Sequence, residues 1–476
     1  MDFIFIFFII FGYKINVFDF SVIVPFLLLL VASIKNNDLL ISKDILIIEC
    51  LFLFLFVIGS VSYVYNVTDF EFEYLLKPIR LILLSVIIYF YFFKKNIQLI
   101  DVIKYITIAS LVNSLVIYSQ YILDFLDVTK NFLIHPVIGT YTPYRKPGLC
   151  TGFPTSGLVS VIGSLLSVFL MFLYRSKYWF IVFCIITSTV LLSARSAMYI
   201  YILIVPVYLM YISIYYKNYI YLKLYFIIII CIILLIYYNI GPLLQGTIDK
   251  MFANIINYYD TGDFNDYSTK HLLSSDHYSL PIQFDNLIIG TSLGKSSGFQ
   301  PSDVSFIRII WSNGLLSLFI YLTAFFSFLF LSYQKVKFFN HKPLSVLLFC
   351  LYLSVFILMF KGPYLFSRII GDSLLLFSLA IIINSNKVWK DKIIFGSEIP
   401  SLFHFPGFPK EYDPFGMDSF FTFGYVPAPI TAYKNIKQLL PGEFLLVENG
   451  KKVFKKYWVL PLSVSKLNVS GNELRE

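Results

Sequence analysis

Apolar residues form long runs along the chain, and short polar segments separate them. A helix rises about 1.5 Å per residue and the hydrocarbon core of a bilayer is about 30 Å thick, so a run of some twenty residues can cross it. Runs of this kind lie at 18–34, 45–64, 77–94, 103–124, 151–172, 177–194, 196–215, 219–238, 310–333, 343–361 and 367–384. With a shorter run at 3–13, which needs snorkelling or local thinning to cross, the pattern predicts an all-α polytopic membrane protein of about twelve spans.

One polar stretch, residues 239–308, is much longer than the others. A long segment without periodicity between two membrane spans is usually functional or disordered. It holds two of the five histidines, His271 and His277. We therefore expect the rest of the chain to be a scaffold for this loop, and the side of the membrane on which it lies to matter for function.

Charge gives the predicted orientation. With a cytoplasmic N-terminus, every inner loop is basic. The residues concerned are Lys35, Lys43, Lys94, Lys95, Arg175, Lys177, Lys217, Lys223, Lys335, Lys337, Lys342, Lys387, Lys390 and Lys392. The 239–308 loop is rich in aspartate instead, so it is predicted to lie outside, and the C-terminus in the cytoplasm.

Composition agrees with the membrane interpretation. Hydrophobic residues make up 58% of the chain and charged residues 14%, against about 25% charge in soluble domains. The net charge of +9 comes from short lysine clusters between apolar runs, which is a topology signal and not a nucleic-acid-binding face. The scattered cysteines, without any CxxC spacing, predict neither a metal site nor a cofactor. They are Cys50, Cys150, Cys184, Cys231 and Cys350.

The arginines follow a different rule from the lysines. Five of them fall at the predicted outer side, and only Arg175 and Arg475 lie inside. The outer five are Arg80, Arg145, Arg195, Arg308 and Arg368. A topology signal needs only positive charge, whereas the planar guanidinium matches phosphate or carboxylate through two bonds. The outer arginines therefore predict an anion site, with the alternative that each one snorkels or pairs with an acid such as Asp303 or Asp372.

Three segments resemble one family, the O-antigen polymerase and ligase superfamily of bacterial membrane glycosyltransferases. They are TYTPYRKPGLCTGFPTSG at 140–157, LLSARSAM at 191–198 and LIIGTSLGKSSGFQPSDVSFIRIIWSNGLLSLFIYL at 287–322. The first carries Arg145 in the family's Arg-x-x-Gly turn, and the second carries Arg195 in its Ser-Arg-Ser helix start. The resemblance covers about residues 1–385.

The resemblance implies transfer of a glycan from undecaprenyl pyrophosphate to an acceptor hydroxyl at the outer face of the bacterial inner membrane, without metal or nucleotide. The arginines would bind the pyrophosphate, and Asp303, His271 or His277 would take the proton. Ligases of the family carry a histidine where this chain has Asp303, which favours a polymerase of lipid-linked repeat units. A flippase and a chain-length regulator of the same pathway are implied as partners.

The composition changes after Asn384, and an Asn-Gly pair in LLVENGKKVF predicts a β-hairpin. Residues 386–476 are thus predicted to form a small soluble α+β segment after the membrane domain at 1–385. FTFGYVPAP and LPGEFLLVENG resemble the class II glutamine amidotransferase domain of asparagine synthetase, over about residues 391–476. That family's nucleophile is a cysteine directly after the initiator methionine, and Asp2 stands there. A fragment of this size also buries little core, so the tail is predicted to be inactive.

Three other functions remain open at this stage. An O-antigen ligase would perform the related transfer. A transporter or flippase of lipid-linked glycan would also need cations facing a cavity, but its usual mark, inverted repeats with broken helices, is not visible in the sequence. An amidotransferase activity of the tail is the third.

Overall fold

The computed structural model describes residues 1–12, 14–15, 18–33, 43–65, 72–125, 146–150, 152–227, 257–262, 274, 278–291, 304–338, 342–362, 367–387, 394–403, 412–448 and 451–459. The chain divides into two compact units, Met1–Val388 and Trp389–Glu476. We call the first the membrane unit and the second the C-terminal unit.

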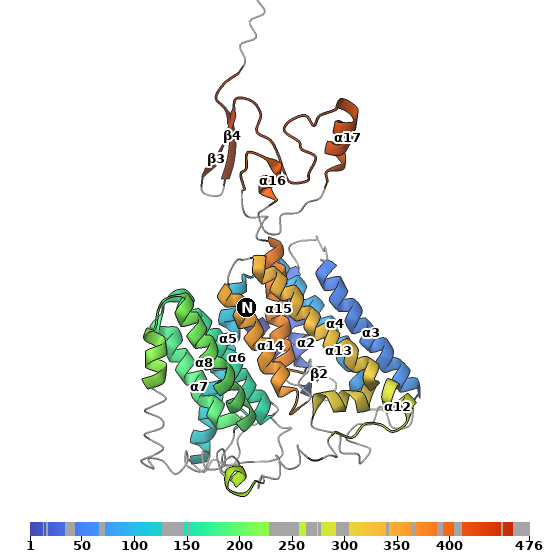
Figure 1. Ribbon diagram of the computed structural model, residues 1–476, viewed down its shortest axis with the longest axis vertical. Helices are drawn as coiled ribbons and strands as arrows, with labels where there is room; N and C mark the ends of the chain where they lie inside the picture. Colours follow the sequence, from blue (N-terminus) through green and yellow to red (C-terminus); the bar gives the residue numbers. More distant parts are fainter. Residues whose placement is uncertain are drawn as a thin grey trace, which may run out of the picture. The chain divides into compact units, whose positions relative to one another are not determined.

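Helices dominate the membrane unit (Figure 1). They are α1 (Asp2–Phe11), α2 (Phe20–Ser33), α3 (Lys43–Tyr65), α4 (Phe72–Lys95), α5 (Leu99–Phe125), α6 (Phe153–Tyr174), α7 (Lys177–Ser193), α8 (Arg195–Tyr215), α12 (Phe284–Ile289), α13 (Ser305–Phe338), α14 (Lys342–Leu358) and α15 (Ile370–Lys387). Among the described residues, six helices are long and apolar enough to cross a membrane, and five apolar helices are shorter. These helices indicate a membrane protein. The number of twelve spans remains a prediction. The expected span 219–238 lies only partly within the described residues.

The first two predicted spans form one helical hairpin. Helix α1 has 10 residues and α2 has 14, so each is shorter than the bilayer core at 1.5 Å per residue. A two-stranded ribbon, β1 (Lys14–Ile15) paired with β2 (Phe18–Asp19), joins them. The hydroxyl of Tyr91, near the end of α4, donates to Asp2 Oδ1 at 2.8 Å and fixes the start of α1 there. The run at 3–13 therefore does not reach across by itself.

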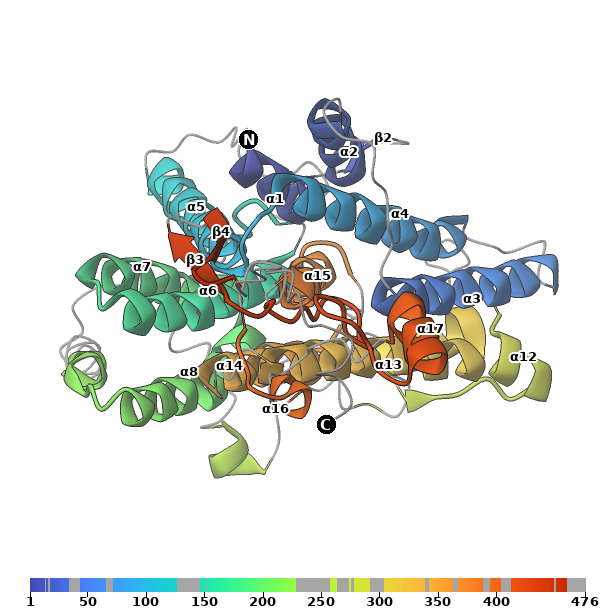
Figure 2. The ribbon, with the colours of Figure 1, turned by 90° about the horizontal axis from the view of Figure 1, so that it is seen from above.

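Helix α6 forms the centre of a tightly packed group with α5 and α7 (Figure 2). Nearly all of its residues are buried. Hydroxyl groups link it to α7: Ser160 Oγ lies 3.0 Å from Thr189 Oγ1, and Ser164 Oγ lies 3.1 Å from Thr187 Oγ1. Helices in a bilayer gain little from hydrophobic burial, so small residues and hydroxyl bonds of this kind hold them together.

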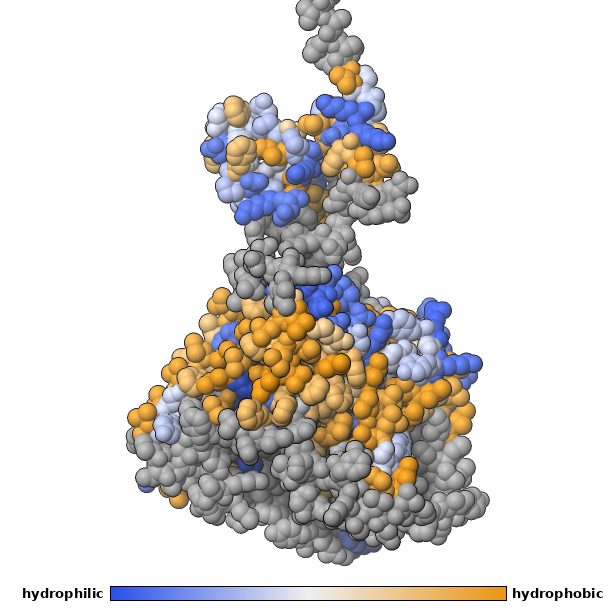
Figure 3. Space-filling model, turned by 180° about the vertical axis from the view of Figure 1, so that it is seen from behind, coloured by the Kyte–Doolittle hydropathy of each residue, from blue (hydrophilic) through white to orange (hydrophobic). Residues whose placement is uncertain are grey.

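Two hydrogen bonds define one end of the membrane unit, which we call the lysine end. Tyr208 Oη donates to Pro343 O at 3.3 Å, so the second half of α8 lies beside the start of α14. Asn384 Nδ2 donates to Ile97 O at 3.2 Å, so α15 ends beside the turn between α4 and α5. Lysines lie at or near helix ends on this side; those within the described residues include Lys94, Lys95, Lys177, Lys217, Lys342 and Lys387. Between the two ends, the outward face of the bundle is a broad apolar surface (Figure 3).

The C-terminal unit contains two short helices and a two-stranded sheet. They are α16 (Ile399–Leu402), α17 (Pro414–Phe423), β3 (Glu443–Glu448) and β4 (Lys451–Lys456). Strands β3 and β4 pair antiparallel, with Glu448 opposite Lys451 across the Asn-Gly turn. The hairpin predicted from LLVENGKKVF is therefore present.

Candidate functional site

Helices α8, α13 and α15 all begin at the end of the bundle opposite the lysine end. We call it the arginine end, because four arginines of the described residues, Arg80, Arg195, Arg308 and Arg368, lie in elements that meet there. In Figure 1 it is the end that carries β2 and α12. Arginines that the sequence placed on one side thus meet at one end of the fold, but lysine is present there as well, because Lys14 pairs with Asp19 in the β1–β2 ribbon and Lys146 lies in the turn at 146–150.

Arg195 starts α8 directly after α7. A single extended residue, Ala194, turns the chain between the two helices, and its carbonyl accepts from Met198 N at 3.1 Å. No side chain of the described residues caps this end of α8. The first N–H groups of the helix and its dipole therefore make the corner electropositive, and Arg195, which is half-buried as a residue, adds a full charge.

The turn at 146–150 is held against the bundle by two amide side chains of α5. Gln120 bonds both backbone groups of Gly148, at 3.0 Å through Oε1 and 3.1 Å through Nε2. Asn113 accepts from Leu149 N at 2.8 Å and donates to Ser156 Oγ at 3.2 Å. Buried amides satisfied in this way fix a loop as firmly as a helix end. The turn therefore has a defined place at the arginine end.

Lys146 belongs to this turn and lies beside the corner of Arg195. Its backbone N–H donates to Leu192 O at 3.4 Å, and Tyr121 Oη donates to the same carbonyl at 3.2 Å. The side chain of Lys146 is only 1% exposed, and its ammonium lies 5.4 Å from the centre of the Tyr121 ring. Burial lowers the pKa of Lys146 to about 8. The backbone of Lys146 is thus bonded to the carbonyl of Leu192, which precedes Arg195 in the same corner of the chain.

Sequence reasoning chose Arg145 in this segment and missed its neighbour. Arg145 lies outside the described residues. The signal for Lys146 was its place in the motif, YRKPGLC, directly before the Pro-Gly turn.

The start of α6 packs on the same corner, because a Cβ at Gly157 would clash with Ala197 of α8.

Arg80 and Arg368 belong to a network of ion pairs within the chain. Arg80 forms a bidentate pair with Asp372, Nη1 to Oδ1 at 3.1 Å and Nη2 to Oδ2 at 2.6 Å. It also donates from Nε to Asp19 Oδ2 at 3.1 Å and from Nη2 to Ser21 Oγ at 2.9 Å. Arg368 pairs with the other oxygen of Asp19. The sequence left open whether each arginine binds an external anion or pairs with an acid of the chain, and Arg80 does the second, with Asp372.

This network joins the tip of the α1–α2 hairpin to α4 and α15. The side chains of Arg80 and Asp372 are 14% and 1% exposed, so both charges are largely out of water. Charges in such a place are stable only when they are paired and hydrogen-bonded. The network therefore holds three segments together that are far apart in sequence.

Arg308 lies in the first turn of α13 and is half-buried. The start of that helix is fixed to the end of α14: Ser305 N donates to Met359 O at 2.9 Å, and Ser305 Oγ donates to Gly362 O. The proposed bases Asp303, His271 and His277 lie outside the described residues.

The last described part of the 239–308 loop folds against α13. Thr291 donates from both its N–H and its hydroxyl to Trp311 O, each at 2.8 Å. Trp311 Nε1 in turn donates to Ser279 O at 2.8 Å. At Gly314, where φ is 82°, α13 kinks, and any side chain there would clash with Ile288. The long loop thus returns to the arginine end through fixed contacts.

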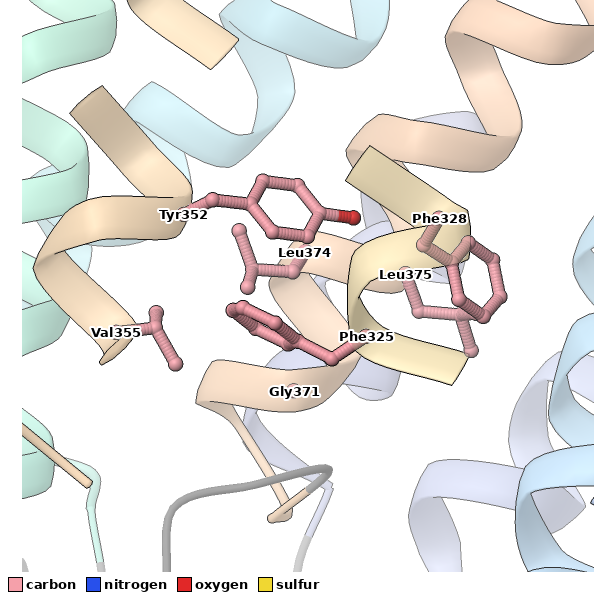
Figure 4. Close-up of a pocket in the computed structure, with 7 residues that line it drawn as sticks. All are labelled: Phe325, Phe328, Tyr352, Val355, Gly371, Leu374 and Leu375. Carbon is pink, nitrogen blue, oxygen red and sulfur yellow. The ribbon is translucent and has the colours of Figure 1, made fainter. Parts of the chain in front are cut away.

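A small apolar hollow lies between α13, α14 and α15 (Figure 4). Its lining residues are Phe325, Phe328, Tyr352, Val355, Gly371, Leu374 and Leu375. This lining suits hydrocarbon and not an anion. Among the described residues, no group of three or more His, Cys, Asp or Glu side chains could hold a metal.

These features define the class: a helical membrane protein with cationic groups gathered at one end of its bundle, followed by a small unit built on a β-hairpin. Residues 384–458 match the family described as a glutamine amidotransferase domain. The match covers the C-terminal unit and the end of α15, which is a small part of the 476 residues. No curated protein and no solved structure matches the chain.

Proposed function

We propose that the membrane unit polymerises lipid-linked oligosaccharide repeat units by glycosyl transfer from undecaprenyl pyrophosphate. The observation that carries the proposal is a backbone bond, from Lys146 N to Leu192 O, which holds the turn of the buried Lys146 against the chain just before Arg195 and the start of α8. A pyrophosphate needs several fixed cationic donors in a site that is poor in water. The end of the 239–308 loop returns to the same end of the bundle.

In this proposal Arg145, Arg195 and Arg308 bind the pyrophosphate. The acceptor hydroxyl attacks the anomeric carbon of the donor sugar while the bond from that carbon to the phosphate oxygen breaks. The pyrophosphate leaves with its bonding electrons and stays on the lipid. Asp303, His271 or His277 accepts the proton of the hydroxyl. Arg80 and Arg368 belong to the same cationic end, where Asp19 and Asp372 pair with Arg80 and Asp19 pairs with Arg368.

The proposal includes the orientation deduced from the sequence: the arginine end at the outer face of the bacterial inner membrane, and both termini in the cytoplasm. The bilayer supplies the lipid-linked substrate, and a flippase and a chain-length regulator act before and after this step. A ligase would use the same cations, and a transporter of lipid-linked glycan would need them as well.

A second candidate follows from the match of residues 384–458 to a glutamine amidotransferase domain. Such an activity needs a nucleophile. The last cysteine in the sequence is Cys350, so the C-terminal unit carries no thiol. We therefore propose that this unit does not hydrolyse glutamine by itself.

The test is Arg195→Lys. Lysine keeps the charge but loses the planar fork, so long-chain glycan should fall tenfold to several hundredfold, as expected for loss of about 1.5 to 3 kcal/mol or somewhat more of charge-assisted bonding. Arg175→Lys is the matched control, because Arg175 ends α6 at the lysine end and should tolerate lysine. Equal tolerance of both variants, at equal expression, would remove the main support for the mechanism.

Deletion of the gene separates the two glycosyl-transfer candidates. Loss of a polymerase leaves single repeat units on the acceptor, whereas loss of a ligase leaves none. The glycan length pattern on a gel gives the answer.

A further inference from the structure

Helix α17 of the C-terminal unit exposes its large side chains and buries its small ones. Gly416 and Ser419 face the rest of the unit, and a Cβ at Gly416 would clash with Thr431. The phenylalanines point outward, each between 47 and 77% exposed; they are Phe415, Phe420, Phe421 and Phe423. A helix in water normally does the reverse. This face of α17 is therefore built for surroundings other than water.

The β3–β4 hairpin mixes lysine and aromatic residues on both of its faces. On one face Phe444 stands opposite Lys455, and on the other Leu445 stands opposite Phe454, next to the pair of Glu443 and Lys456. Lys455, Lys456, Phe454 and the following Tyr457 and Trp458 are all exposed. Lysines reach toward phosphate while their stems and the aromatic rings stay in a less polar layer. This composition is typical of segments that lie at a membrane interface.

A membrane surface is always within reach of this unit. Helix α15 ends at Lys387, and the first described residue of the C-terminal unit is Ile394. Seven residue steps span at most about 25 Å. We propose that the exposed side chains of α17 and of the β3–β4 hairpin bind the anionic phospholipid headgroups of the membrane that holds the chain. This inference does not depend on the proposed glycosyl transfer.

Two observations favour lipid over a protein partner as the cover of these side chains. Every apolar cross-strand pair of the hairpin has a lysine in a neighbouring pair, so neither face offers the wide apolar area that a stable protein interface requires. The lysines of β4 are complementary in charge to anionic headgroups. Orange and blue areas accordingly alternate over the visible face of the unit (Figure 3).

The experiment uses the full-length protein in nanodiscs that contain phospholipids brominated near the glycerol, which quench tryptophan fluorescence on contact. The chain has four tryptophans, so the contribution of Trp458 is the difference between the native protein and Trp458→Phe. Phe330→Trp, placed on the exposed outside of α13, is the positive control for lipid contact. Each sample is prepared with phosphatidylglycerol and with phosphatidylcholine alone.

We expect Trp458 to be quenched at least twofold more strongly in phosphatidylglycerol than in phosphatidylcholine. The difference should disappear in Lys455→Ala/Lys456→Ala and weaken with salt, because screening acts on exposed charges. The proposal is overturned if Trp458 is not quenched while the tryptophan of the Phe330→Trp control is. This also holds if the emission of the unquenched Trp458 is shifted to the blue, because a protein partner then covers it. Equal quenching in both lipids, unchanged by the lysine substitutions, also overturns it.

Discussion

Replacing Arg80 by methionine should destabilise the membrane unit strongly. Methionine has a similar length but carries no charge, so Arg80→Met leaves the carboxylate of Asp372, 1% exposed, without its bidentate partner. Asp19 loses one of its two arginines as well. Removal of one partner of a buried ion pair costs about 3 to 5 kcal/mol, because the remaining charge stays in a medium of low dielectric constant. That corresponds to a shift of roughly two to four orders of magnitude in the unfolding equilibrium.

A double-mutant cycle isolates the pair from other effects. Asp372→Asn alone should cost less than Arg80→Met, because Arg80 keeps Asp19 as a partner. In the double variant no uncompensated Asp372 charge remains, so its cost should fall short of the sum of the single costs by about 2 to 3 kcal/mol. The assay is unfolding in mixed micelles with increasing denaturing detergent, followed by tryptophan fluorescence.

The chain provides its own control for this cycle. Lys104 and Asp101 form an ion pair three residues apart on α5, and both are partly exposed, at 32 and 42%. Lys104→Met should therefore change stability by no more than about 1 kcal/mol. If Arg80→Met is as mild as Lys104→Met, the network does not hold the α1–α2 hairpin to α4 and α15, and the reasoning from burial is wrong.

Three further predictions can be checked separately. In whole cells, Ser274→Cys should react with a membrane-impermeant thiol reagent and Asn340→Cys should not; equal labelling would refute the orientation. The pKa of Lys146 is lowered to about 8, so the native state loses this proton before the unfolded chain does, and the free energy of unfolding should rise between about pH 8 and 10.5. The rise should be smaller in Lys146→Met, and an unchanged pH profile in that variant would show that Lys146 is not the cause. Truncation after Ser385 should leave long-chain glycan unaltered, since the C-terminal unit carries no thiol nucleophile; its loss at normal protein levels would contradict this.

Local pattern was enough to predict much of this protein. Helices occur at the apolar runs, because a bilayer leaves a backbone few other ways to satisfy its hydrogen bonds. The Asn-Gly pair placed the β3–β4 hairpin through the dihedral angles its turn needs. The meeting of four arginines at one end was also visible, since alternating spans bring every second loop to the same end, although Lys146 lies there as well. What these predictions share is that each depends on neighbours in the sequence.

Tertiary structure decided the partners of each charge. Arg80 and Asp372 are 292 positions apart, and no periodicity links them. The place of Lys146 depends on Gln120 and Asn113 of α5, which hold its turn through backbone groups that the sequence does not distinguish. In α17 the pattern of large and small residues does not say which face is inside; the close contact of Gly416 with Thr431 decides it. Such contacts depend on the simultaneous packing of distant segments, and hydropathy, which describes one residue and its neighbours, does not contain that information.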